Sequence, residues 1–437
     1  MLGRVIQNYR AAFSGLPREI WFLSLIMLIN RSGSMVLPFL SLYVSKELNL
    51  GYDSAGAIVA CFGAGSCIGS FAGGYLADRF GPFRTQIFSL LGNAVGFAVL
   101  SQMTTFRSFA TVIFITSIVS DVFRPANGAS ITFLSPAHLH RKAFALNRLA
   151  INLGFTVGPL VGGILAFYSY QWLFWVNACT CVITAITFIA LLGFRLKEYT
   201  SPHGEAVAEV MNPKSPFRDG RFLIFIVLNF ATFCVFFQLI STFPLFLEQR
   251  FHLNEFQIGT LLGLNTVVIV FFEMVLIESI KGYSLLKTIA WGAMLMCLGF
   301  GILPFGNGYW FAALTVLVWT VGEMLGMPQM LAFVTQLSDR TSRSRYLGMY
   351  MLSVSLAMVQ GPLIGSRLFA TQGTSFWHYG TAVGALVFVG YYLMSRFEVT
   401  AAKANEQGAR DRSRINSQSD HLVAEPAQKI ASSRGQL

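Results

Sequence analysis

The sequence predicts an all-α integral membrane protein in which twelve transmembrane helices form two pseudo-symmetric six-helix bundles. Three observations lead to this prediction: the composition, the number of long apolar segments, and a repeat between the two halves. Of the 437 residues, 54% are hydrophobic and only 12% are charged, whereas soluble domains carry about 25% charged residues. Lipid is therefore the expected solvent for most of this chain.

Twelve apolar segments are long enough to cross a bilayer, which takes about 20 helical residues. The spans are residues 20–45, 54–77, 84–103, 107–134, 143–168, 171–194, 220–247, 256–279, 284–304, 308–337, 345–370 and 375–396. We expect an N-terminal bundle over 20–194 and a C-terminal bundle over 220–396. The remaining parts are an N-terminal segment (1–19), a polar linker with three prolines (195–219) and a disordered tail (397–437).

The basic residues predict the orientation in the membrane. With the N-terminus inside, 24 of the 31 Lys and Arg fall in cytoplasmic segments, and only Lys46, Arg107 and Arg250 fall in outer loops. An excess of Lys and Arg on the cytoplasmic side is the usual asymmetry of membrane proteins. The even number of spans then places both termini in the cytoplasm. The expected location is the plasma membrane, which in a bacterium is the inner membrane.

The two halves of the chain share a repeat at a constant spacing. The string GPLVGG at 158–163 returns as GPLIGS at 361–366, which is 203 positions later. The same offset, without gaps, pairs Pro125 with Pro328. Spans four and five therefore correspond to spans ten and eleven, as expected for a transporter built from internal repeats.

Three motifs resemble those of one family, the major facilitator superfamily. The loop after span two reads GGYLADRFGPFR at 73–84, span four contains FRPANGA at 123–129, and span five contains NLGFTVGPLVGG at 152–163. The first is similar to the loop signature of that superfamily. The second is similar to its fourth-span arginine motif, with Asn127 where the family often has Gln. The third is similar to the fifth-span glycine-proline motif of its drug/proton antiporter branch. The resemblance covers about residues 15–396 and implies the major facilitator fold.

The loop motif and the span-five motif have physical roles that fit this resemblance. A carboxylate at the cytoplasmic interface can cap a helix or pair with Arg, which ties helices together in one state. Glycines at every fourth position permit close helix approach, and a proline bends the helix. The expected gating-loop residues are Gly74, Asp78, Arg79, Gly81 and Arg84. The expected helix-bend residues are Gly154, Gly158, Pro159, Gly162 and Gly163.

Ionisable residues within the spans are the best candidates for function, because each costs at least about 2.5–3.5 kcal/mol at mid-membrane. Asp121 and Arg124 are three residues apart, so they share a helix face. The resemblance implies a role for Arg124 in proton transfer or substrate charge balance. Arg31 lies mid-span, so it should face a cavity, pair with a carboxylate or hold an anionic substrate group. Its position partly resembles the first-span motif of proton-coupled peptide transporters, whose glutamates are absent here because Asn30 and Met27 stand in their places.

Two carboxylates in the second half complete the expected site. Glu273 and Glu323 lie in apolar surroundings, where a carboxyl group readily takes up a proton. We expect Asp121, Arg124, Glu273 and Glu323 to serve proton coupling. We expect the substrate to contact Asn30, Arg31, Arg124, Trp319 and Glu323. Structural roles near the membrane interfaces are expected for Arg148, Glu278 and Arg367.

Aromatic and Met side chains of the second half can form an adaptable apolar pocket. About one in three of them is expected to touch substrate, since most Phe must face lipid. The residues are Phe236, Phe237, Phe271, Phe272, Trp319, Met324, Met327 and Met330.

The leading prediction is a proton-coupled antiporter that works by alternating access and exports amphipathic small molecules. The first alternative is a proton-coupled symporter that imports peptides or other carboxylate-bearing solutes. A non-transporting membrane sensor is the alternative from a different class, and an enzyme is not expected because no nucleophile, metal or nucleotide motif is present. The expected partners are a small-molecule substrate, protons and the lipid bilayer. No cofactor, metal ion or nucleic acid is expected, the proton gradient supplies the energy, and the chain is expected to be a monomer.

Overall fold

The computed structural model describes residues 13–193, 215–280, 282–338 and 342–397, and within these ranges all regular structure is helical. The first twelve residues, the linker up to residue 214 and the tail from residue 398 lie outside the described residues. Eleven described stretches are long and apolar enough to cross a membrane. The last of them, 345–397, contains two helices, so the predicted twelve-helix fold is confirmed.

The described part of the first half contains eight α-helices because spans one and four are each divided. Span one breaks at Gly33, and span four breaks at Val122. The helices are α2 (Arg18–Ser32), α3 (Val36–Lys46), α4 (Tyr52–Phe80), α5 (Pro82–Leu100), α6 (Phe106–Asp121), α7 (Phe123–Leu134), α8 (His140–Tyr168) and α9 (Gln171–Leu192).

The second half repeats the interruption of its first span. A short 3₁₀ helix, η4 (Phe237–Ile240), separates α10 (Gly220–Phe236) from α11 (Thr242–Phe251). The following helices are α12 (Glu255–Ser279), α13 (Leu285–Gly301), α14 (Gly308–Leu337), α15 (Arg343–Gln372) and 376–397. Spans one and seven, the first span of each half, are therefore both discontinuous, which is a common feature of transporter helices that line a binding site.

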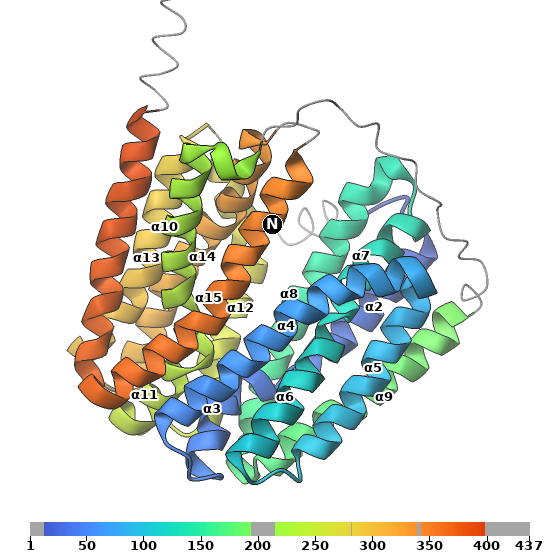
Figure 1. Cartoon of the computed structure of the whole chain (residues 1–437), viewed down its shortest axis with the longest axis horizontal. Helices are drawn as coiled ribbons and strands as arrows, with labels where there is room; N and C mark the ends of the chain where they lie inside the picture. Colours follow the sequence, from blue (N-terminus) through green and yellow to red (C-terminus); the bar gives the residue numbers. More distant parts are fainter. Residues whose placement is uncertain (1–12, 194–214, 281, 339–341, 398–437) are drawn as a thin grey trace, which may run out of the picture.

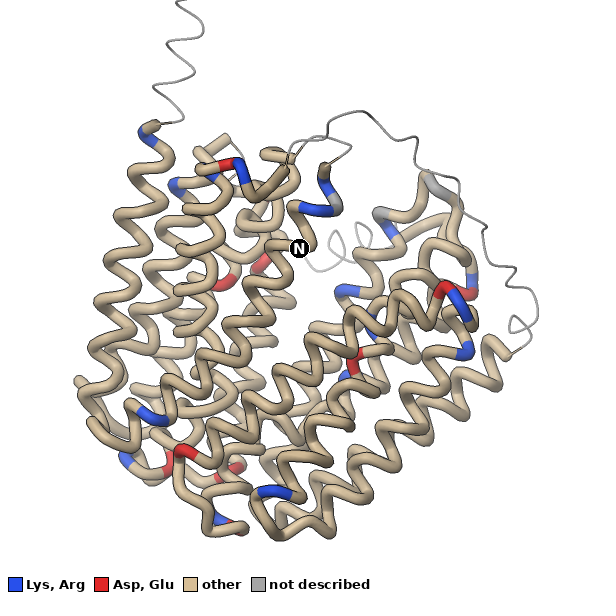
Figure 2. Tube along the Cα trace, viewed as in Figure 1, with Lys and Arg blue, Asp and Glu red and all other residues tan. Residues whose placement is uncertain are grey.

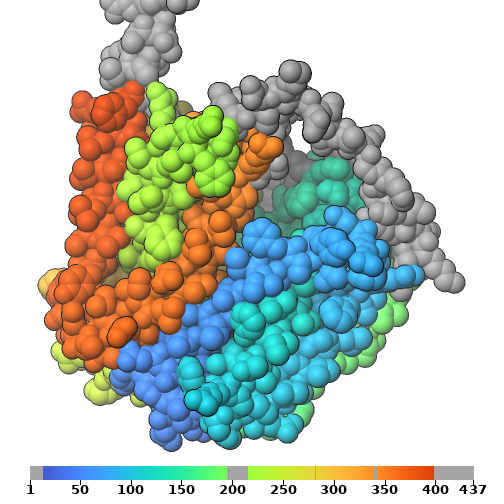
Figure 3. Space-filling model, viewed as in Figure 1, coloured from blue at the N-terminus to red at the C-terminus, as the bar shows by residue number. Residues whose placement is uncertain are grey.

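The two halves lie side by side, in contact at one end and diverging toward the other (Figure 1). We call the end where α9 ends and α10 begins the linker end, and the opposite end, where α3 and α11 meet, the far end. At the far end one apolar core joins both halves and includes Phe39 and Phe174 of the first half and Phe246 and Trp377 of the second. Toward the linker end each half has its own core. Among the described residues the core shared by both halves thus lies at the far end, and the space-filling view shows the halves parting toward the linker end (Figure 3).

The two halves approach each other closely where α8 crosses α12. A Cβ atom added to Gly259 would lie 2.5 Å from the Pro159 carbonyl oxygen and 3.0 Å from Gly163 Cα. These are backbone atoms, which cannot move aside like the end of a side chain. The small residues at this crossing therefore let the two helices pack backbone to backbone.

Gly259→Ala is expected to destabilise the protein, because its methyl group would push α12 away from α8. Gly348→Ala is the matched control, since Gly348 lies on α15 with no atom within 4 Å of an added Cβ. There alanine should stabilise the helix by about 0.5–1 kcal/mol. In thermal unfolding of the purified variants, the melting temperature of Gly259→Ala should lie below that of the parent and that of Gly348→Ala above it. A Gly259→Ala variant as stable as the parent would contradict the close packing.

Candidate functional site

A cavity of about 570 Å³ lies between the two halves. The first half supplies most of its polar lining: Asn30, Arg31, Ser34, Ser66, Ser89, Asn93, Ser120, Asp121, Arg124, Asn152 and Asn177. The second half supplies a mainly apolar wall: Phe233, Phe236, Phe237, Leu239, Ile240, Leu262, Ile269, Met327 and Met358. Asn265, Thr266 and Glu323 are the polar groups on that wall. The first half also supplies apolar lining residues, among them Leu37, Leu40, Phe62, Phe97 and Phe155. The cavity thus has polar groups gathered mainly on the first half, within a lining that is apolar on both halves.

Arg31 is held in the cavity wall by close packing in the first half. It lies in the last turn of α2, just before the break at Gly33. A Cβ atom on Gly154 would lie 2.4 Å from Arg31 Cβ, so only glycine leaves room for the arginine stem. The guanidinium carbon lies 5.5 Å from the centroid of the Phe155 ring. Its buried Nε has no hydrogen-bond partner among the described residues, which leaves a donor for a ligand.

Asp121 and Arg124 line the cavity as an ion pair, with 3.3 Å between Asp121 Oδ1 and Arg124 Nη2. They pair across the break at Val122, since Asp121 ends α6 and Arg124 lies in the first turn of α7. The Asp121 side chain is 9% exposed and that of Arg124 is 65% exposed. An ion pair with one exposed partner contributes little to stability. Its main effect is to neutralise the Asp121 carboxylate inside the protein.

Glu323 reaches the cavity from α14 and is positioned by α12. Its Oε2 accepts a hydrogen bond of 3.0 Å from Asn265 Nδ2, which also lies 3.1 Å from the Thr320 hydroxyl. Thr320 in turn donates to the Val316 carbonyl. Glu323 is therefore held by a neutral amide and borders the cavity directly.

Glu273 lies outside the cavity lining and makes an ion pair with Arg148 across the two halves. The Glu273 side chain on α12 is 10% exposed, whereas that of Arg148 on α8 is 53% exposed. Because one partner belongs to each half, relative motion of the halves changes the distance between them. A proton-coupling role for Glu273 stays a prediction, and the pair gives it a structural context.

The side chain of Trp319 is fully buried and absent from the cavity lining, so its expected contact with substrate stays a prediction. It stacks on Phe300 at a centroid distance of 5.5 Å and its Cβ packs on Gly299. The other four expected substrate contacts do line the cavity. Of the aromatic and Met set, the cavity-lining members are Phe236, Phe237 and Met327. Phe271 and Phe272 are exposed on the outer surface, and Met324 and Met330 are buried.

The loop motif lies at the linker end, between α4 and α5. Gly81 has a φ of +86°, a conformation that favours glycine, and Pro82 begins α5. Arg79 Nη1 donates to the Tyr75 hydroxyl at 3.0 Å, one turn earlier on the same helix. Charged residues gather at the two ends of the molecule and are sparse between them (Figure 2). The motif therefore lies at the end of the molecule where the two halves diverge. Its gating role stays a prediction.

The glycines of the span-five motif all lie on α8, but they pack against different halves of the molecule. Gly154, Gly158 and Gly162 face Arg31 and Met35 within the first half, whereas Gly163 faces α12 of the second half. Pro159 lies inside the continuous helix α8. The motif thus places Arg31 and also allows the close crossing between halves.

Sequence reasoning missed several polar residues of this site. Asn265 lies eight residues before Glu273 on α12, so helical spacing puts it near the same face. The sequence did not indicate that Arg148 pairs with Glu273, because the two residues meet only through the packing of α8 on α12. The inter-half contacts of Lys46 at the far end were also missed, since they join residues about 200 positions apart in the chain.

The Major Facilitator Superfamily model matches residues 20–362 of this chain. The chain is 23% identical over 374 residues to a Na⁺, Li⁺, K⁺/H⁺ antiporter of Planococcus maritimus, an alignment that covers 77% of this chain and 85% of that protein. It is 24% identical over 371 residues to the quinolone resistance protein NorA of Staphylococcus aureus, covering 83% and 93%.

Solved structures show the same fold. A crystal structure of the peptide transporter POT in complex with sulfate aligns with a TM-score of 0.76 and 16% identity, covering 89% of this chain and 96% of that one. The family match extends over most of the chain and agrees with the three sequence motifs and the twelve-helix fold. The chain therefore belongs to the Major Facilitator Superfamily of membrane transporters.

Proposed function

We propose that this transporter is a proton-coupled antiporter that exports amphipathic small molecules by alternating access. The observation that carries this proposal is the cavity between the halves, in which polar groups, mostly from the first half, lie among apolar and aromatic side chains from both halves. An amphipathic molecule can contact the polar groups and the apolar lining at once, whereas a small ion or sugar would leave the apolar lining without a partner. The names of two relatives, an antiporter and a quinolone resistance protein, support antiport and export.

The orientation is part of the proposal. Most Lys and Arg fall in segments that connect at the linker end, which supports a cytoplasmic linker end. The apolar core shared by both halves would then close the extracellular side. In this arrangement the cavity belongs to an inward-facing state, ready to receive substrate from the cytoplasm.

Proton coupling rests on the charged groups around the cavity. Glu323 borders the cavity and can lose its charge on taking up a proton. A positively charged substrate group and a proton would then compete for the same carboxylate. Protonation would also change the balance between inward- and outward-facing states, because the charge interacts differently with the two halves in each state.

A second candidate function is proton-coupled import of carboxylate-bearing solutes, which is favoured by the unpartnered Nε of Arg31 in the described part of the cavity wall. The two functions differ in the direction of proton flow relative to substrate. Antiport exchanges substrate for protons across the membrane, whereas symport moves both the same way. This difference does not depend on how the protein is oriented in a vesicle.

We expect norfloxacin, added outside proteoliposomes that contain a pH-sensitive dye, to make the interior more alkaline. Each molecule entering by antiport is exchanged for at least one proton leaving. Dialanine serves as the probe for symport and would make the interior more acidic. Protein-free liposomes are the control for passive permeation of the drug. Acidification by either probe would contradict antiport, and no proton movement with a wider set of drugs, dyes and peptides would favour the sensor.

A further inference from the structure

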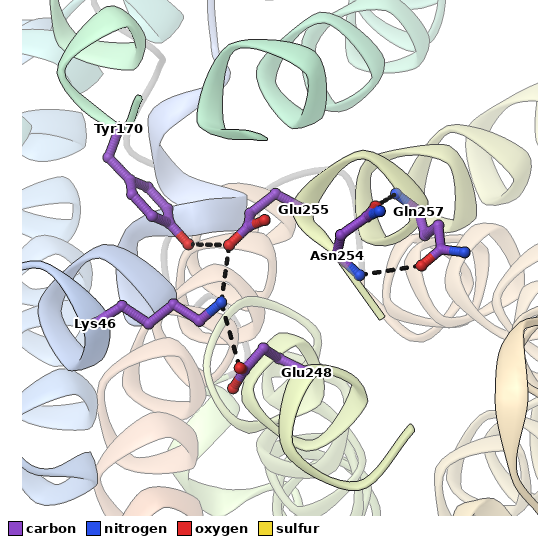
Figure 4. A network of polar contacts seen from close by, with 6 residues as sticks. All are labelled: Lys46, Tyr170, Glu248, Asn254, Glu255 and Gln257. Atoms are coloured by element: carbon purple, nitrogen blue, oxygen red, sulfur yellow. Dashed lines mark hydrogen bonds and ion pairs between the residues drawn. The ribbon is translucent and has the colours of Figure 1, made fainter. Parts of the chain in front are cut away.

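A polar network joins the two halves at the far end (Figure 4). Lys46 Nζ, at the end of α3, donates to Glu255 Oε1 at 2.9 Å and lies 3.3 Å from Glu248 Oε1. The Tyr170 hydroxyl donates to the same Glu255 oxygen at 2.7 Å. Lys46 and Tyr170 belong to the first half, and both carboxylates belong to the second. All three contacts therefore cross between the halves.

Glu255 is the centre of this network, and its position is fixed by the local structure. It is the first residue of α12, where the helix N-terminus favours a negative charge. Asn254 and Gln257 form a reciprocal capping box that sets where the helix begins. A Cβ atom on Gly163 would lie only 2.7 Å from the Glu255 carbonyl, so α8 packs directly against this turn. Glu255 is thus fixed beside the first half.

The environment strengthens the contacts. The Glu255 side chain is 12% exposed, compared with 30% for Glu248 and 36% for Lys46. Burial, followed by the hydrogen bond to Glu255, raises the pKa of Tyr170, so its hydroxyl stays protonated and keeps donating. Charge-assisted hydrogen bonds of this kind are stronger than neutral ones. Glu255 receives two such bonds, from two separate segments of the first half.

We propose that Lys46, Tyr170 and Glu255 form a latch that holds the far end shut, with Glu248 as an auxiliary partner of Lys46. Glu255 is its positioning residue. Opening the far end separates the halves there, so it must break both bonds to Glu255 at once. The latch therefore sets how often the cavity opens at the far end. Assigning that side to the outside of the cell rests on the proposed function.

The test measures access to the cavity from each side of the membrane. Leu40 on α3 lines the cavity and is only 1% exposed within the core that closes the far end. Leu40→Cys, in a protein whose six native cysteines are replaced, is labelled with a membrane-impermeant maleimide in right-side-out and inside-out vesicles. We expect Glu255→Gln to increase the labelling rate in right-side-out vesicles at least about fivefold, since it weakens both charge-assisted bonds. Lys46→Met should have a similar effect, and Glu248→Gln should change the rate less than about twofold.

Glu47→Gln is the matched control, because Glu47 is an exposed carboxylate next to Lys46 on the first half. It removes the same charge at the same end, so a general electrostatic effect would appear in both variants. Equal labelling of Glu255→Gln and Glu47→Gln would overturn the latch. If Glu255→Gln does not fold, Tyr170→Phe removes one bond to the same oxygen and should still raise labelling about twofold. No increase with Tyr170→Phe would then overturn the proposal.

The same measurement distinguishes a failure of the latch proposal from a failure of the proposed function. An increase confined to inside-out vesicles would support the latch and overturn the proposed orientation. An increase in right-side-out vesicles together with no proton movement in the proteoliposome assay would support the latch and overturn proton coupling. Restoration of slow labelling by combining Lys46→Glu with Glu255→Lys would show that the inter-half contact itself, and not either charge alone, keeps the far end closed.

Discussion

Glu323→Gln is expected to abolish proton-linked transport while leaving the fold intact. Glutamine has nearly the same shape and can still accept the hydrogen bond from Asn265 Nδ2 that Glu323 accepts at 3.0 Å. It carries no ionisable group, so it cannot exchange a proton during the cycle. We expect drug-induced proton movement in proteoliposomes to fall at least about tenfold, which corresponds to about 1.4 kcal/mol or more in the coupled step.

Glu278→Gln is the control for this experiment. Glu278 is an exposed carboxylate on α12 and is not part of the cavity lining. Its substitution removes one negative charge from the same half and should leave transport within about twofold of the parent. Thermal unfolding shows whether both variants keep the parent fold. Normal proton-linked transport by a folded Glu323→Gln variant would remove Glu323 from the coupling mechanism.

Arg148→Glu is expected to produce the second large effect, because it replaces an inter-half ion pair by two opposed carboxylates. Glu273 is nearly buried and would lose its only positively charged partner among the described residues. Breaking a buried pair costs about 3–5 kcal/mol, and the half-exposed side chain of Arg148 reduces that to about 1–3 kcal/mol. We expect a lower melting temperature and transport that is slower by about tenfold or more.

The double variant Arg148→Glu with Glu273→Arg tests whether the pair itself is responsible. If the contact between α8 and α12 matters, the swapped pair should recover at least about half of the lost melting temperature. Recovery of stability without recovery of proton-linked transport would assign the carboxylate on α12 a coupling role in addition to its pairing. A swapped variant no better than Arg148→Glu alone would contradict a direct inter-half interaction.

The sequence was sufficient to predict the spans because lipid imposes a strong local constraint. A helix that crosses a bilayer needs about 20 apolar residues, whatever its neighbours are. The predicted limits of span five, 143–168, therefore agree closely with α8 (His140–Tyr168). The breaks at Gly33 and Val122 were not predicted, although polar residues interrupt the apolar pattern at both places, with Asn-Arg-Ser before Gly33 and Ser-Asp before Val122.

The candidate site was predicted only in part. Arg31, Asp121, Arg124 and Glu323 were found because ionisable groups are costly in a membrane, and these four line one cavity. Trp319 was placed in the site by its neighbour in the sequence, Glu323, four residues later. In the structure it turns into the core and stacks on Phe300, and only packing between α13 and α14 decides that direction.

The sequence by itself thus determined a twelve-helix transporter of the Major Facilitator Superfamily, since hydropathy and short motifs are local properties of the chain. Only the tertiary structure decided which charges meet. Glu273 pairs with Arg148 from the other half, Glu323 is held by Asn265, and Lys46 finds Glu255 at a separation of 209 residues. The physical reason is that these contacts depend on how α8 and α14 pack against α12 and how the end of α3 meets the start of α12, which no local pattern encodes.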